Sequence, residues 1–201
     1  MIIDTTAIPA SAAATGLHWP SSQATALSNV DFVLAEGNGT QHVGLFMEEG
    51  SGGLLNDLTF YGGKIGANLG NQQYTARNLR FYGCETAISQ LWDWGWTYKS
   101  LVVEDCGVGI EMVDNNTASI TLLDSEFSRV GDAIRTKRRG GETEPEAAGS
   151  LVLENVRFSE VEAVLTGVDG VIIPGDTTGE VHVRGYADVS LLLTLVVDGE
   201  C

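Results

Sequence analysis

The sequence predicts an all-β chain folded as a single-stranded, right-handed parallel β-helix of about six coils, truncated at both ends. Two observations predict this fold. A short segment recurs every 20 to 30 residues or so, which is the period of a solenoid. The 201 residues also include 25 glycines but only 4 prolines, and 43% of them are hydrophobic. Glycines spread through apolar runs are typical of the many tight turns of an all-β chain.

The repeated segment has an Asx or Ser, an apolar residue, a variable residue and then Phe or Val. Its six copies are Asn29–Phe32, Asp57–Phe60, Asn78–Phe81, Ser100–Val103, Asp124–Phe127 and Asn155–Phe158. Ser125 departs from the apolar rule in the fifth copy. In a β-helix, equivalent positions of successive coils stack at the inter-strand spacing of about 4.8 Å. We therefore expect an inward ladder of Phe side chains, and a turn ladder of Asx side chains that bond neighbouring backbone.

A second apolar position follows the Phe or Val of five copies by seven residues: Ala67, Ile88, Ile110, Ile134 and Leu165. A glycine or alanine precedes four of these. Each repeat therefore holds two short β segments separated by a turn. A leucine-rich repeat is excluded because it needs a dense leucine ladder and a helical return, whereas short Val-, Ile- and Phe-bearing strands with polar loops suit a parallel β-helix.

The spacing of the repeats also predicts the domain organisation. Residues 1–186 are expected to form a partial parallel β-helix domain, and residues 187–201 a divergent apolar tail. Insertions are expected at Gly37–Gly53 and in the charged Arg135–Gly149 segment, which reads as a surface loop. Cys84 and Cys106 fall at the same place in adjacent repeats and are expected to be buried neighbours, whereas three cysteines give no disulfide framework.

The charge balance restricts the partners. Eleven basic and 27 acidic residues give a net charge of −16, so nucleic acids and anionic membranes would be repelled. Acidic polysaccharides are disfavoured for the same reason, while a neutral glucan is not. The longest apolar stretch, Val189–Val197, is too short to span a bilayer, and the first residues do not resemble a signal peptide. The three histidines lack metal-ligand spacing, so no cofactor is expected.

The segment Trp92–Tyr98 carries three of the four tryptophans. Strand alternation would place Trp92, Trp94 and Trp96 on one side of an extended stretch. Aromatic rings combine a large apolar area with a polar group, which suits carbohydrate binding. The alternative is that these rings form a hydrophobic plug that covers the β-helix.

Amides and carboxylates provide the other candidates. Gly70–Gln73 is a run of amides after a turn glycine, which can hold a water molecule or sugar hydroxyls without adding charge. Glu48, at a glycine-rich turn, and Asp93, between two tryptophans, are candidate carboxylates, because glycosidases need two carboxyl groups. The alternatives are an amide stack in a turn, and acids that are simply solvated.

These segments together resemble a known family. Thr15–Trp19, Gly44–Gly53, Asp57–Phe60, Gly70–Gln73 and Trp92–Thr97 occur in the same order as in the amino-terminal β-helix of glycoside hydrolase family 55, the fungal-type exo-β-1,3-glucanases. The resemblance runs from about Ile3 to about Gly170. It implies a pectate-lyase-like β-helix from a secreted enzyme that releases glucose from β-1,3-glucan (laminarin) with inversion.

The resemblance also implies site residues. Gln73 and Thr97 would position the attacking water, and the cleft would be lined by Gln72, Glu48, Trp92, Asp93, Trp94 and Trp96. The family's general acid lies in a second β-helix domain, which this chain is expected to lack. Activity of the chain alone therefore stays open.

Two other functions remain possible at this point. A non-catalytic β-helix, either a glucan-binding or a structural module, would use the aromatic segment without a second domain. A pectin-active β-helix enzyme is disfavoured by the negative charge and the amide-rich cleft. The fold alone does not decide among them.

Overall fold

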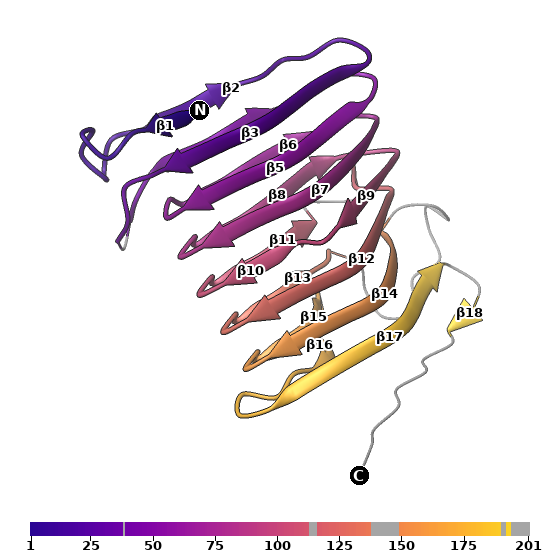
Figure 1. Cartoon of the computed structure of the whole chain (residues 1–201). Helices are drawn as coiled ribbons and strands as arrows, with labels where there is room; N and C mark the ends of the chain where they lie inside the picture. Colours follow the sequence, from indigo (N-terminus) through magenta and orange to yellow (C-terminus); the bar gives the residue numbers. More distant parts are fainter. Residues whose placement is uncertain (38, 113–115, 138–148, 190–191, 194–201) are drawn as a thin grey trace.

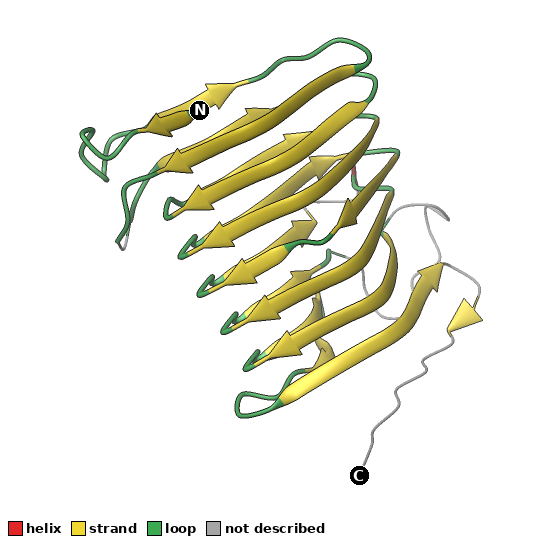
Figure 2. Ribbon diagram, viewed as in Figure 1, coloured by secondary structure: helices red, strands yellow, loops and turns green. Residues whose placement is uncertain are grey.

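The computed structural model describes residues 1–37, 39–112, 116–137, 149–189 and 192–193. Nearly all of its regular structure is β-strand, arranged as successive rungs along one axis (Figures 1 and 2). No helix among these residues is both long and apolar enough to cross a membrane.

The strands form two sheets. The first contains β1 (Ile2–Asp4), β3 (Thr25–Val33), β5 (Gly53–Tyr61), β7 (Gln73–Tyr82), β9 (Gly95–Lys99), β10 (Val102–Glu104), β12 (Ser119–Ser128), β14 (Ser150–Ser159), β17 (Glu180–Val189) and β18 (Leu192–Leu193). The second contains β2 (Ala14–His18), β4 (His42–Met47), β6 (Ile65–Gly70), β8 (Thr86–Trp92), β11 (Val108–Met112), β13 (Asp132–Arg135), β15 (Ala163–Gly167) and β16 (Gly170–Pro174).

The chain passes alternately from one sheet to the other, and each strand pairs in parallel with its counterpart in the next coil. This arrangement continues from β1 to β15. The predicted parallel β-helix is therefore confirmed. The reason lies in the repeat, because each short strand can bury its apolar side only against the neighbouring coils.

The last positions of the six predicted repeats stack in register. Phe32, Phe60, Phe81, Val103, Phe127 and Phe158 are aligned residue by residue along the first sheet. Phe32, Phe60 and Phe81 lie with ring centroids 4.7 Å apart and nearly parallel planes, and all are fully buried. The second apolar position is also in register, from Leu17 and Leu45 through Ala67, Ile88, Ile110 and Ile134 to Leu165.

Small residues precede this second column because the Phe ladder packs against them. A Cβ atom added to Gly44 would lie 2.4 Å from the Gly66 carbonyl oxygen and 2.9 Å from the Phe60 ring. At Gly66 the added atom would lie 2.7 Å from the Phe81 ring. The glycines at these positions therefore make room for the phenylalanines of the opposite wall.

The predicted Asx ladder is a column of left-handed residues. Asn29, Asp57, Asn78, Ser100, Asp124 and Asn155 all have φ between 47° and 58°. Each bends its long strand, and asparagine and aspartate tolerate this conformation best after glycine. The prediction that their side chains bond neighbouring backbone is not what the structure shows. The bonds run between side chains of the column: the Asn78 amide donates to the Asp57 carboxylate at 3.0 Å, and Asn155 donates to Asp124 at 2.8 Å.

Substitution of this column tests its conformational role. We expect Asn78→Ala to lower the free energy of unfolding by about 1–2 kcal/mol, because alanine pays the cost of the left-handed conformation and loses the bond to Asp57. Asn78→Gly should stay closer to the unsubstituted protein, since glycine adopts φ > 0 freely. Urea unfolding of both variants measures the difference. Equal stability of Asn78→Ala and the parent chain would contradict this account.

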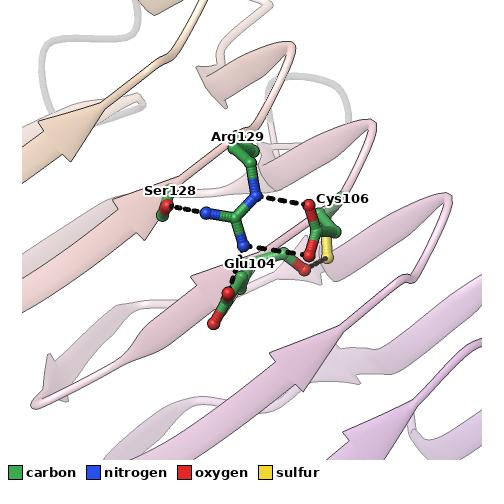
Figure 3. Close-up of polar contacts among 5 residues, drawn as sticks. Glu104, Cys106, Ser128 and Arg129 are labelled. Atoms are coloured by element: carbon green, nitrogen blue, oxygen red, sulfur yellow. Dashed lines mark hydrogen bonds and ion pairs between the residues drawn. The ribbon is translucent and has the colours of Figure 1, made fainter. Parts of the chain in front are cut away.

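A second left-handed column follows the Phe segment. Gly62 and Gly83 have φ of 69° and 67°, and Asp105, Arg129 and Glu160 take the same place with φ between 53° and 55°. Arg129 is held there by its guanidinium, which donates to Ser128 Oγ at 2.9 Å and to the Glu104 and Asp105 carboxylates of the preceding coil (Figure 3). The bond from Arg129 to the Asp105 carboxylate lowers the pKa of Asp105. No residue pattern in the sequence predicted this second left-handed column.

The two cysteines are buried neighbours, as predicted. Tyr82 and Glu104 are paired in adjacent strands, and Cys84 and Cys106 each lie two residues after one of them; both cysteines are buried. Both are free thiols, and Cys106 Sγ lies 3.3 Å from the Glu104 carbonyl oxygen (Figure 3).

The insertion expected at Gly37–Gly53 is wrong in its middle, where a regular strand lies. Residues 42–47 form β4, a regular strand in register with β2 and β6. The extra length lies on both sides of this strand. Residues 34–41 stand where later coils have a turn of only three residues, and residues 48–52 stand where the next coil has only residues 71–72. The tip of the other predicted insertion, residues 138–148, lies outside the described residues.

The pairing changes after β15. β16 pairs with β15 and β17 pairs with β14, both antiparallel, so the parallel coils end at Gly167. β17 continues through the predicted boundary at 186/187, and residues 190–191 and 194–201 lie outside the described residues. The boundary of an apolar tail stays a prediction.

Candidate functional site

The sequence-predicted site residues gather at one corner of the β-helix, where the chain passes from the second sheet to the first. Glu48 follows β4, Gln72 lies between β6 and β7, and Gln73 is the first residue of β7. The segment Trp92–Thr97 runs from the end of β8 into β9. Since β4, β6 and β8 are neighbouring strands, the connections that follow them, from β4 to β5, from β6 to β7 and from β8 to β9, lie in successive coils. The fold therefore brings together residues up to about 50 positions apart.

Gln73 and Thr97 line a common groove. A shallow cavity of about 340 Å³ is bounded by Gly52, Gly53, Gln73, Tyr74, Thr75, Gly95 and Thr97. Thr75 and Thr97 are directly paired in β7 and β9, and Gln73 is paired with Gly95. The lining offers amide and hydroxyl groups but no charge. It suits a neutral, hydroxyl-bearing ligand.

Glycine forms one wall of this groove for a steric reason. A Cβ atom at Gly53 would lie 2.2 Å from the Thr25 carbonyl oxygen and 2.5 Å from the Tyr74 hydroxyl. Gly52 has φ of +122°, a conformation that other residues rarely adopt. A side chain at either position would therefore displace the groove wall.

Asn71 holds this wall in place. Its side chain is fully buried, donates to the Glu49 carbonyl oxygen at 3.2 Å and accepts from the Gly52 N–H at 3.1 Å. The Asn71 carbonyl oxygen also accepts from the Trp96 indole N–H at 3.0 Å. The amide run thus contains one structural member, Asn71, and one exposed member, Gln73.

Trp96 does not line the groove. Its indole is 1% exposed and stacks on Tyr74 with the centroids 5.0 Å apart. Side chains alternate between the two faces of β9. Trp96 and Tyr98 point inward, and Thr97, which lies between them, therefore points outward. The expectation that Trp96 lines a cleft is therefore wrong, and the ring belongs to the core beneath the groove.

The three tryptophans do not share one face either. β8 ends at Trp92 and β9 begins at Gly95, so the strand is interrupted between them. Trp94 stands in this break with 62% of its surface exposed, and its backbone N–H donates to the Gln72 carbonyl oxygen at 2.8 Å. Trp94 is the ring available to a ligand, and it is fixed beside Gln72.

Trp92 and Glu48 are linked to each other. The half-buried Trp92 donates its indole N–H to the Glu48 carbonyl oxygen at 2.8 Å. The Glu48 carboxylate lies 2.9 Å from His18 Nε2, and the His18 ring stacks on Phe46. Glu48 is thus a partly exposed acid at the corner, paired with a histidine that sequence analysis left unassigned.

Asp93 is an anchor beneath the surface. It is 2% exposed, and its Oδ1 accepts from the Ala118 N–H at 2.9 Å and the Ser119 N–H at 2.8 Å. Burial raises the pKa of Asp93 to about 6, partly offset by these two bonds. Asp93 thus joins the break between β8 and β9, which we call the Trp94 turn (residues 93–94), to the start of β12. The expectation that Asp93 lines the cleft is wrong.

Comparison of the sequence with known protein families identifies the family of this chain. The family model "Rhamnogalacturonase A/epimerase, pectate lyase-like" matches residues 1–111, more than half of the chain. The chain belongs to this pectate-lyase-like family. The match contains the groove, the Trp94 turn and both glutamines.

Curated relatives share this pectate-lyase-like segment. A "Probable glucan endo-1,3-beta-glucosidase" of Arthroderma benhamiae is 40% identical over 181 residues, which cover 87% of this chain and 20% of that protein. A "Glucan 1,3-beta-glucosidase" of Cochliobolus carbonum is 35% identical over 181 residues, 87% of this chain and 23% of that protein. The resemblance to glucan 1,3-β-glucosidases is thus confirmed.

A third relative has a different name. The "Non-secreted LysM effector LysM19" of Penicillium expansum is 35% identical over 158 residues, 74% of this chain and 12% of that protein. The chain spans about a fifth of the length of the first two relatives and less of the third. The relatives' names therefore describe much longer proteins.

Sequence reasoning missed three residues of this pectate-lyase-like corner: His18, Asn71 and Tyr74. Tyr74 lines the groove, and its hydroxyl is 2.7 Å from Thr25 Oγ1. Asn71 stood in the quoted amide run, but only its burial distinguishes it from Gln72 and Gln73. Among the residues that the structure describes, no three His, Cys, Asp or Glu side chains gather as metal ligands would.

Proposed function

We propose that this chain is the glucan-holding part of a β-1,3-glucan hydrolase. The observation that carries the proposal is the uncharged groove in which Gln73 and Thr97 face outward from adjacent coils. Its amide and hydroxyl groups match the hydroxyls of a neutral glucan, and a chain with a net charge of −16 disfavours an acidic polysaccharide. The names of the two glucosidase relatives support the same substrate class.

The proposed reaction is hydrolysis from the chain end with inversion. Gln73 and Thr97 would orient the attacking water, while Trp94 would stack on a sugar ring beside them. Inversion requires a general acid on the opposite side of the glycosidic bond, about 6.5–9.5 Å from the base. No residue lining the groove bears a carboxylate, and Glu48 is paired with His18. We place the acid in a second β-helix domain of the same protein, which we propose to be secreted.

Binding and hydrolysis of laminarin test this function. We expect laminarin to retard the chain in an affinity gel without glucose release. Gln73→Ala and Thr97→Val should each weaken retention about five- to tenfold, since each removes a hydrogen bond worth about 1–1.5 kcal/mol.

Thr59→Val is the matched control, because Thr59 lies on β5 beyond its left-handed bend and outside the groove lining. It should bind as the parent chain does. Absence of retention, or equal loss in the control, would overturn the proposal. Glucose release by the chain alone would contradict the placement of the acid.

A non-catalytic glucan-binding module is the second candidate. The carboxylate-free lining of the groove favours it. The same assay on the longer protein distinguishes the two, because only the hydrolase releases glucose in a Gln73-dependent manner.

A further inference from the structure

Three threonines form a column on the outer side of the first sheet. Thr75, Thr97 and Thr121 are paired residue to residue in β7, β9 and β12, which lie side by side in Figure 1. Their neighbours in each strand, such as Tyr74, Trp96 and Ile120, are buried, so the threonines point outward. Parallel pairing places the three hydroxyls about 4.8 Å apart along the helix axis.

The hydroxyls of this threonine column have no partner among the described residues of the protein. Thr97 and Thr121 are half-buried and Thr75 is exposed. The backbone around them is already paired within the sheet. Three hydrogen-bonding groups are therefore in line and available to a ligand.

The residues around the threonine column leave its middle uncovered and limit its length to three coils. On one side lie Gln73, Gly95 and Ser119, of which the glycine carries no side chain to cover Thr97. At the ends of the column, Leu54 pairs with Thr75 and Val152 pairs with Thr121, so the hydroxyls stop after three coils. Thr121 lies beyond the cavity that Gln73 and Thr97 line.

We propose that the threonine column is a track for a β-glucan chain aligned with the helix axis, with Thr121 contacting a sugar beyond the Gln73–Thr97 groove. The inference rests on the proposed function and extends it. A pyranose unit is similar in length to one coil spacing, so successive sugars meet equivalent hydroxyls. Sugar hydroxyls both donate and accept, as threonine does, and no charge has to be neutralised.

This arrangement predicts a dependence of affinity on ligand length. A disaccharide covers the groove and at most two coils, whereas a trisaccharide or tetrasaccharide reaches Thr121. Affinity should rise from laminaribiose to laminaritriose and then level off, because Val152 offers no hydroxyl to a fourth sugar.

Calorimetric titration with laminaribiose, laminaritriose and laminaritetraose tests the track. Thr121→Val should weaken binding of the two longer ligands about five- to tenfold and leave laminaribiose unchanged. Thr121→Ser keeps the hydroxyl and should bind all three as the parent chain does, which separates loss of the hydroxyl from misfolding. Thr59→Val serves as the matched control outside the column.

The outcomes distinguish this inference from the proposed function. If none of the three ligands binds, the proposed function fails. If laminaribiose binds in a Gln73-dependent manner but Thr121→Val matches the parent chain for every ligand, the groove stands and the track is wrong. Equal affinity for all three lengths would also overturn the track.

Discussion

Trp96→Ala is expected to lower the free energy of unfolding by about 3–5 kcal/mol, the usual cost of truncating a buried aromatic residue. The Trp96 indole is 1% exposed and stacks on Tyr74, and its N–H donates to the Asn71 carbonyl oxygen. Alanine would leave a large cavity beneath the groove and an unpaired buried carbonyl group. Urea unfolding monitored by circular dichroism measures this loss.

Trp94→Ala is the matched control, two positions away in the same segment. Trp94 is 62% exposed, so its truncation should change the unfolding free energy by less than about 0.5 kcal/mol. It should instead weaken laminarin retention. If the two variants were equally stable, the division into a core ring and a surface ring would be wrong.

Asp93→Asn is expected to remove a large pH dependence of stability. The pKa of Asp93 is about 6 in the folded chain, above the ordinary aspartate value of 3.8. Below pH 3.8 the carboxyl is protonated in both states. As the pH rises, the unfolded chain loses this proton first, so stability falls until the folded group also ionises at about pH 6. The difference of about two pH units corresponds to about 3 kcal/mol.

The comparison is made as a difference between the two chains. Asp105 and Asp124 have lowered pKa values through Arg129 and Lys99, and they change stability in the opposite sense. Because both chains carry them, subtraction leaves the contribution of Asp93. Relative to the variant, the parent chain should lose about 3 kcal/mol between pH 4 and pH 7. Asparagine can still accept from the Ala118 and Ser119 N–H groups. Parallel stability curves over this range would contradict the burial argument.

Much of the fold could be predicted because its information is local and repeated. The Phe column is in register at every predicted position, and the Asx column is left-handed at all six. The sequence failed where a regular position was filled by an unusual residue. Arg129 occupies a left-handed position that its own segment of sequence does not predict. Its guanidinium is held there by bonds to Glu104 and Asp105 of the preceding coil.

The sequence predicted which residues gather at the candidate site, but it did not predict which of their side chains are buried. Gln73 and Thr97 line one groove and Trp94 is exposed beside it, whereas Trp96 and Asp93 are buried. Strand periodicity assigned all three tryptophans to one side, because a break in the strand at Asp93–Trp94 leaves no mark in that periodicity.

The sequence by itself determined the repeat, the two stacked apolar columns and the turn residues, since a solenoid coil contacts only its neighbours. Only the tertiary structure decided which site residues face solvent, that the Asp93 carboxylate is buried, and that three threonines from separate coils form one line. These properties depend on the register between coils, which is set by packing of the whole stack and not by any one segment.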